Sequence, residues 1–211
     1  MTDRQAFEKI ILRAAGLSGQ RGDNILFAGL DFEVPGGAAL ALRGPNGAGK
    51  TTLLLTLAGL ITPAAGTIEF DGPDSEGPPI LHFCGHHNAI KQRLSVFENL
   101  EFWAALNGGT GNSVPAALDR VGLGAIASVD AGHLSAGQGK RLALARLLVS
   151  HRPVWLLDEP MAALDSAGDQ LIGVLLDEHL AAGGVVIAAT HDDLPLGDTA
   201  RGRVLRLGAA S

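Results

Sequence analysis

The feature that most constrains the fold is a glycine-rich loop at residues 44–51, which reads Gly-Pro-Asn-Gly-Ala-Gly-Lys-Thr. The short apolar run Ala38–Arg43 precedes this loop, and the leucine-rich stretch Lys50–Leu60, which has the composition of a helix, follows it. Strand, loop and helix in this order are the context that the pattern G-x-x-x-x-G-K-[ST] requires. The segment therefore predicts a phosphate-binding turn between a buried strand and a helix.

Each position of this loop has a physical reason. Glycines let successive backbone N–H groups turn inward as a concave nest, and the N-terminus of the following helix adds partial positive charge for anionic oxygens. We expect Lys50 to reach the β- and γ-phosphates of a nucleotide and the Thr51 hydroxyl to ligate Mg²⁺, which prefers hard oxygen ligands. The predicted nucleotide-binding residues of this segment are Gly44, Pro45, Asn46, Gly47, Ala48, Gly49, Lys50, Thr51 and Thr52.

A second predicted strand ends in two carboxylates. The run Val154–Asp158 is apolar up to its last residue, and Glu159 follows directly. Asp158 is suited to a water-mediated hold on Mg²⁺, and Glu159 to polarising an attacking water, because phosphoryl transfer is catalysed mainly by positioning and charge stabilisation. Taken alone, such a pair is equally compatible with a helix cap.

The rest of the chain alternates between strand and helix patterns. Further strand candidates are Ile10–Ala14, Leu30–Val34, Thr67–Phe70 and Ile80–Cys84. Between residues 95 and 150 apolar side chains recur at helical spacing, up to Val149. The apolar run Val185–Ala189 follows a predicted helix at about 167–181. Buried runs joined by helices indicate an α/β fold with a mostly parallel sheet covered on both faces.

Composition excludes several classes of protein. Hydrophobic residues make up 46% and charged residues 18%, so the chain can bury a core and is not disordered. The net charge of -6 argues against a general nucleic-acid binder, which carries excess Lys and Arg. The longest apolar stretch, Leu53–Ala65, is interrupted by Gly59 and Pro63 and is shorter than the roughly 20 residues that cross a bilayer. With one cysteine and no signal peptide, we expect a cytosolic chain. Any function at a membrane would need a separate membrane-spanning partner.

A further motif distinguishes among nucleotide-binding families. Residues 134–138 read Leu-Ser-Ala-Gly-Gln, end 20 residues before Asp158, and lead into an apolar helix. This segment resembles the signature of ATP-binding cassette (ABC) ATPases, and Ala163–Asp165 and His191 resemble the D-loop and switch histidine of that family. The five motifs stand in the family's order within about 10–207. A guanine-specific Asn-Lys-x-Asp is absent, which disfavours GTPases.

The resemblance implies a P-loop NTPase fold in a single ABC ATPase domain, 1–211. Its RecA-like core would comprise about 1–90 and 150–211, with an antiparallel β subdomain, and an inserted helical subdomain would comprise about 91–149. The implied cofactors are ATP and Mg²⁺. The implied catalytic residues are Glu159, His191 and Lys50, and the signature residues Ser135, Gly137 and Gln138 would bind ATP held by a second copy. The working unit would therefore be a homodimer.

Three positions depart from the family pattern. Arg21 stands where the family usually has an aromatic residue that stacks on adenine, and the chain has no tyrosine. A guanidinium group can also stack on a ring, so Arg21 is predicted to bind the base, with a solvated surface arginine as the alternative. His87 stands where the Q-loop glutamine would contribute a hard oxygen to Mg²⁺, and imidazole suits softer metals. The metal-binding role of His87 is therefore an open prediction. Met161 replaces a common threonine, which is interpreted as a tolerated packing change.

A possible transition-metal or haem site lies in the neighbouring segment. His82, Cys84 and His86 alternate, so an extended strand would place them on one face. The cluster lacks a standard zinc spacing or a Cys-x-x-Cys-His sequence, and buried histidines and cysteines are more often core residues. The core interpretation is favoured.

The segments 84–91 and 94–103 resemble those of the ATPase subunits of bacterial cytochrome c maturation haem exporters. That resemblance implies a haem-transporting translocase, peripheral on the cytoplasmic face of the inner membrane and bound to a permease subunit, with His87–Trp103 as the candidate contact surface. The leading alternative is the ATPase of another small-molecule or lipid ABC exporter. A cassette protein acting on ribosomes or DNA would need two fused cassettes or coiled-coil arms, and a non-hydrolysing regulator conflicts with the intact motifs.

Overall fold

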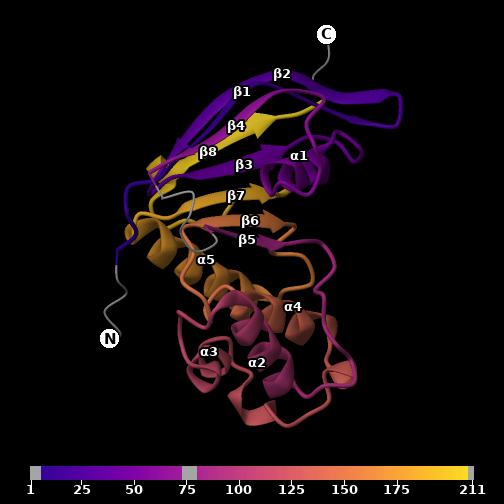
Figure 1. Cartoon of the computed structure of the whole chain (residues 1–211). Helices are drawn as coiled ribbons and strands as arrows, with labels where there is room; N and C mark the ends of the chain where they lie inside the picture. The colour runs from indigo at the N-terminus through magenta and orange to yellow at the C-terminus, as the bar shows by residue number, and fades with distance from the viewer. Residues whose placement is uncertain (1–5, 73–79, 209–211) are drawn as a thin grey trace. The chain divides into compact units, whose positions relative to one another are not determined.

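A computed structural model describes residues 6–72 and 80–208, which form two compact units (Figure 1). The first unit contains the chain up to Gly85, Pro153–Glu159 and the residues from Gly173 onward; the second contains His86–Arg152 and Pro160–Ile172. In these described ranges, no helix combines the length and apolar character that membrane spanning requires.

The first unit contains a five-stranded parallel sheet with the order β5-β6-β7-β3-β8. Its strands are β3 (Ala39–Arg43), β5 (Leu81–Cys84), β6 (Val154–Asp158), β7 (Val185–Ala189) and β8 (Gly202–Arg206). Every residue of β6 and β7 is buried, which is why both were predicted as continuous apolar runs. The strand β8 was not predicted, because it is a mostly exposed strand with arginines at two of its five positions.

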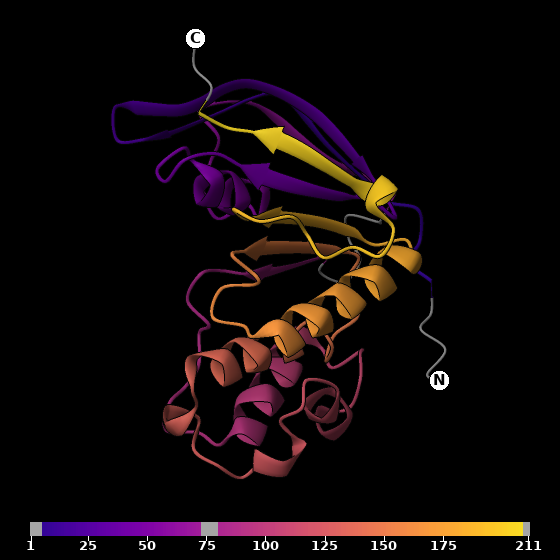
Figure 2. The ribbon, with the colours of Figure 1, turned by 180° about the vertical axis from the view of Figure 1, so that it is seen from behind.

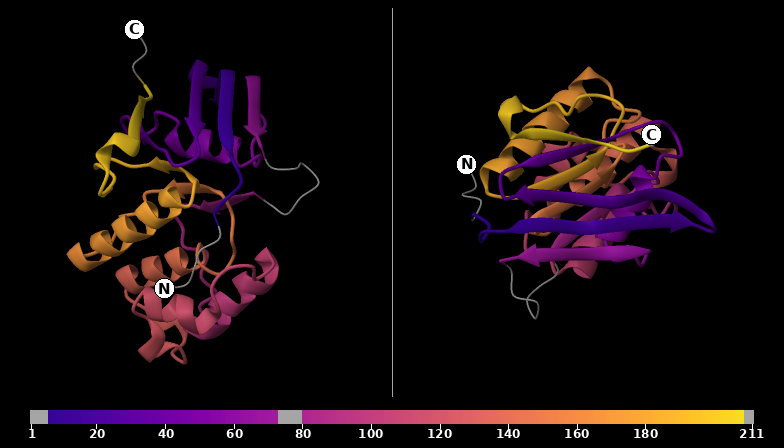
Figure 3. Two further views of the ribbon diagram at one scale, coloured as in Figure 1. Left: turned by 90° about the vertical axis from the view of Figure 1, so that its left-hand side faces the viewer. Right: turned by 90° about the horizontal axis from the view of Figure 1, so that it is seen from above.

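A three-stranded antiparallel sheet with the order β2-β1-β4 completes this unit (Figure 3, right). Its strands are β1 (Ile11–Arg21), β2 (Asn24–Pro35) and β4 (Ala65–Asp71), each longer than the sequence predicted. Arg13 on the central strand forms ion pairs with Glu33 and Asp71 on the two flanking strands. This exposed ladder gives the sheet a polar face, and the other face supplies Leu12 and Leu17 to the core.

The helix α1 (Lys50–Leu57) packs against strands of both sheets. Leu53, Leu54 and Leu57 are almost fully buried in the cluster that joins the two sheets. The helix ends three residues earlier than predicted, because the chain turns at Ala58 and Gly59 adopts a positive φ of 70°. The core therefore anchors α1, which directly follows the glycine-rich loop, against β1, β6 and β7.

The second unit is helical, with α2 (Val96–Asn107), α3 (Val114–Arg120), α4 (Ala136–Ala145) and two short 3₁₀ turns. The N-termini of α2 and α4 carry reciprocal capping boxes, Ser95 with Glu98 and Ser135 with Gln138. The helix α4 ends at Ala145, four residues before the predicted end of the helical pattern, and the backbone tightens into i→i−3 hydrogen bonds beyond it. The long helix α5 (Ser166–Ala181), seen from behind in Figure 2, begins in the second unit and ends in the first.

Candidate nucleotide-binding and catalytic site

The glycine-rich loop has a backbone that only glycine accommodates at its two ends. Gly44 has φ of 154°, and a Cβ there would lie 2.4 Å from the carbonyl oxygen of Leu207. Gly49 has φ of 95°, and a Cβ there would lie 2.9 Å from Cβ of Leu26. Both contacts are shorter than van der Waals separation. The tight turn predicted from the sequence is therefore fixed by close packing against β2 and the segment after β8.

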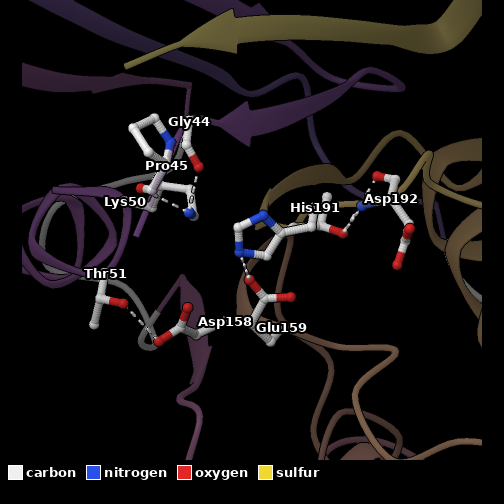
Figure 4. Close-up of polar contacts among 9 residues, drawn as sticks. Gly44, Pro45, Lys50, Thr51, Asp158, Glu159, His191 and Asp192 are labelled. Atoms are coloured by element: carbon white, nitrogen blue, oxygen red, sulfur yellow. Dashed lines mark hydrogen bonds and ion pairs between the residues drawn. The ribbon is translucent and has the colours of Figure 1, made fainter. Parts of the chain in front are cut away.

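The Lys50 side chain folds back over this loop (Figure 4). Its Nζ donates to the carbonyl oxygens of Gly44 at 2.8 Å and Pro45 at 3.3 Å, and the residue is 8% exposed. A buried ammonium group at the N-terminus of a helix favours binding of an anion. Phosphate oxygens carry more negative charge than these carbonyls, so they can replace them as acceptors.

Thr51 and Asp158 meet although 107 residues separate them along the chain. The Thr51 hydroxyl donates to Oδ2 of Asp158 at 3.0 Å, at the point where β6 ends and α1 begins. Asp158 is only 4% exposed. A hydroxyl and a carboxylate side by side are the hard oxygen donors that Mg²⁺ prefers, so the residues present fit that ion.

Glu159 and His191 form the other half of the site in the first unit. His191 Nε2 lies 3.5 Å from Oε1 of Glu159, and the Glu159 backbone N–H donates to the carbonyl oxygen of Ala189 at 2.9 Å. Glu159 has φ of 47°, a left-handed conformation that is unfavourable for a residue with a side chain. Strained backbone of this kind often occurs at functional sites, and here it aims the carboxylate at the imidazole (Figure 4).

The loop that carries His191 is held by residues that the sequence analysis did not identify. The Thr190 backbone N–H donates to the carbonyl oxygen of Leu42 at 3.2 Å. The Thr190 hydroxyl accepts from the Asp192 backbone N–H at 3.1 Å. Arg43, directly before Gly44, forms an ion pair with Asp193. The only sequence signal was the position of these polar residues at the ends of two buried strands.

The signature residues lie in the second unit, at the start of α4. The Ser135 hydroxyl accepts from the Gln138 N–H at 3.2 Å, and Gln138 Oε1 accepts from the Ser135 N–H at 2.9 Å. Further along α4, Arg141 pairs with the D-loop residue Asp165 at 2.9 Å. A hydrogen bond from the backbone of Gly168, and then this arginine, lower the pKa of the Asp165 carboxyl below its ordinary value.

Two of the three departures from the family pattern, Arg21 and His87, lie at exposed positions. Arg21 is at the end of β1, opposite Asn24 in the hairpin, and His87 is in the second unit with its ring 5.6 Å from that of His86. Their roles in base stacking and metal binding stay predictions. Across residues 6–72 and 80–208, no group of three or more His, Cys, Asp or Glu side chains is placed to hold a metal ion.

Comparison with known proteins identifies the family. Residues 27–162 match the family model described as ABC transporter. The chain belongs to the ABC transporter family. The match spans the glycine-rich loop, the signature and the two carboxylates. Membership of the ABC transporter family makes the chain a nucleotide-binding ATPase subunit and implies a membrane partner.

The most similar relatives share nearly the whole chain. A protein from Rhodopseudomonas palustris (strain BisB5) named "Cytochrome c biogenesis ATP-binding export protein CcmA" is 53% identical over 95% of this chain and 99% of its own. A protein of the same name from Rhizobium johnstonii is 48% identical over 88% of this chain and 90% of its own. Among solved structures, a putative ABC transporter ATP-binding protein from Pyrococcus furiosus superimposes with a TM-score of 0.78 at 24% identity, covering 93% of this chain and 97% of that one. This structural likeness confirms the predicted ABC ATPase fold.

Proposed function

We propose that this chain is the ATP-hydrolysing subunit of a haem-transporting exporter in c-type cytochrome biogenesis. It would be bound to a membrane permease, on the cytoplasmic face of a bacterial inner membrane. The observation that carries this proposal is the 53% identity to a cytochrome c biogenesis export protein over nearly the full length of both chains. The first unit would be the RecA-like core, about 1–90 and 150–211, and the second the helical subdomain, about 91–149.

The chain's own residues divide the work of hydrolysis. Lys50 exchanges its bonds to two backbone carbonyls for bonds to the β- and γ-phosphates of ATP. Thr51 and Asp158 would hold Mg²⁺, which neutralises charge on the phosphate oxygens when bound. The Glu159 carboxylate polarises the attacking water, and His191, 3.5 Å from it, orients that carboxylate. Arg21 would support the base, and His87 would replace the Q-loop glutamine.

We further propose that two copies close over two ATP molecules, with Ser135, Gly137 and Gln138 of one copy completing the site of the other. The support is that each chain has one glycine-rich loop and one signature. If contacts to ATP and ADP differ, hydrolysis shifts the equilibrium between closed and open forms. Replacing Glu159 by Gln keeps the shape and removes the charge. We expect Glu159→Gln to accumulate as an ATP-bound dimer in size-exclusion chromatography; a variant that stays monomeric with saturating ATP and Mg²⁺ contradicts this.

The test of the haem system uses a strain in which the chromosomal copy carries Lys50→Ala. We expect loss of haem-stained c-type cytochromes, and we expect the wild-type chain to co-purify with a permease from native membranes. Lys9→Ala, which removes an exposed lysine of the same unit, is the matched control. Undiminished cytochromes in the Lys50→Ala strain would refute the haem assignment while leaving ATP hydrolysis in place.

A further inference from the structure

The loop at residues 86–95 contains His87, and hydrogen bonds hold its second half, residues 91–95, in place. The buried side chain of Asn99 on α2 accepts from the Lys91 N–H at 2.8 Å and donates to the carbonyl oxygens of Lys91, Leu94 and Ser95 at 2.9–3.1 Å. The Gly132 N–H also donates to Gln92 at 3.0 Å. These bonds constrain residues 91–95 and reach no residue from 86 to 90.

The first half of the loop needs its own constraint. Ala89 has φ of 50°, and a left-handed conformation costs an L-residue about 1–2 kcal/mol. Nη1 of Arg146 donates to the carbonyl oxygen of Asn88 at 3.3 Å, next to this residue. The Asn88 side chain also lies close to α4, since a Cβ added at Gly139 would be 3.4 Å from its Nδ2.

Arg146 is itself held by an aromatic ring. Its guanidinium carbon lies 3.6 Å from the ring centroid of Trp103 on α2, a close cation–π stack. A planar group stacked in this way can direct its N–H groups in its own plane. One side chain thus joins α2 to the Asn88 backbone, and both contacts lie within the second unit.

The placement of Arg146 connects this loop to the signature. Arg146 caps the C-terminus of α4, and Ser135 caps its N-terminus. A cavity of about 450 Å³ is lined by His87 and Asn88 from the loop and by Ser135 and Gly139 from the signature segment. The bond from Arg146 to Asn88 therefore ties the C-terminal end of α4 to the loop that lines this cavity.

We propose that Arg146 is a positioning residue for the ATPase reaction. Stacked on Trp103, it holds the His87–Ala89 backbone in its left-handed turn beside the signature and so sets the geometry of the cavity between them. The expected effect of Arg146 on ATP turnover rests on the proposed function. Its expected effect on the backbone of the loop does not. The stack on Trp103 and the bond to Asn88 both lie within the second unit, so loss of Arg146 should lower kcat and leave KM for ATP nearly unchanged.

The structural test measures backbone amide order parameters by NMR in the full-length chain. Rigid backbone gives values near 0.85 and flexible backbone values below about 0.6. We expect Arg146→Met, which keeps an apolar stem, to lower the values of residues 87–90 below about 0.6 while residues 91–95 stay rigid. The control is Lys91→Met, which removes a cation 4.3 Å from the neighbouring ring of Phe102 and leaves the Asn88 contact intact. Unchanged values at 87–90, or an equal loss through 91–95 and α2, would overturn the proposal.

The functional test uses the complex with its membrane partner. We expect Arg146→Met to lower kcat about tenfold, the size of one lost charge-assisted hydrogen bond, with KM for ATP within about twofold of wild type. Arg146→Lys keeps a positive charge and an N–H donor, so it should recover part of the lost order at residues 87–90 and part of the lost kcat. The lysine variant serves as the test if the methionine variant does not fold. A fall in kcat that the lysine variant shares in full, or a matching rise in KM, would overturn the proposal. A wild-type complex without ATPase activity would instead refute the proposed function.

Discussion

The left-handed backbone at Glu159 predicts that the proposed catalytic residue destabilises the fold. Its φ of 47° is held by the hydrogen bond from its N–H to Ala189, so the conformation persists when the side chain changes. A left-handed conformation costs an L-residue about 1–2 kcal/mol, whereas glycine adopts it freely. Glu159→Ala retains this cost and Glu159→Gly relieves it. Both variants lose the carboxylate near His191, so the difference between them isolates the backbone effect.

The magnitude follows from two opposing effects on the free energy of unfolding. Glycine gains about 1–2 kcal/mol by relief of strain and loses about 0.5–1 kcal/mol through the extra entropy of its unfolded chain. The net expectation is that Glu159→Gly is more stable than Glu159→Ala by about 0–1.5 kcal/mol, which is a rise in Tm of up to about 6 °C for a chain of this size. At an ordinary position the order is reversed, with glycine less stable than alanine.

Urea unfolding followed by circular dichroism measures this difference, with the two variants compared at equal denaturant slope. ATP hydrolysis should be lost in both variants, because each lacks the group proposed to polarise water. The reasoning is refuted if the glycine variant is the less stable of the two by about 1 kcal/mol, which is the behaviour of a residue with ordinary backbone angles.

Three further predictions rest on the second unit. Ser95→Ala and Ser135→Ala each remove a capping hydroxyl and should each cost about 1 kcal/mol in urea unfolding, but only Ser135→Ala should also lose ATPase activity; equal activity in the two would argue against a nucleotide role for Ser135. The Ser95 backbone and then its side chain lower the pKa of the Glu98 carboxyl, so its stabilisation is present above the ordinary value of 4.5 and is lost as pH falls through the lowered folded value. Urea unfolding of wild type and Glu98→Gln should therefore differ at pH near 7 and converge in strong acid, and a difference that persists unchanged in acid contradicts this. A Cβ at Gly111 would lie 2.2 Å from the Leu148 carbonyl oxygen, so Gly111→Ala should cost about 1–3 kcal/mol in thermal unfolding, and an unchanged midpoint would show that this backbone approach is not rigid.

The amino-acid order determined the local parts of this protein. The strands Val154–Asp158 and Val185–Ala189 could be predicted because a buried parallel strand needs a continuous apolar run. The loop at 44–51 could be predicted because its close turns and its lysine are encoded within eight consecutive residues. Both are short-range requirements, so a single sequence carries them in full.

Contacts between distant residues were decided by the folded sheet. β8 became a strand because it pairs with β3, and its mostly exposed sequence Arg-Val-Leu-Arg has no apolar run from which a strand could be predicted. The bond from Thr51 to Asp158 and the hold of Arg43 on Asp193 exist because the strand order places β3, β7 and β6 side by side. Composition and periodicity describe which face of an element is buried, but they do not state its neighbour, since strand order emerges only when the whole core packs together.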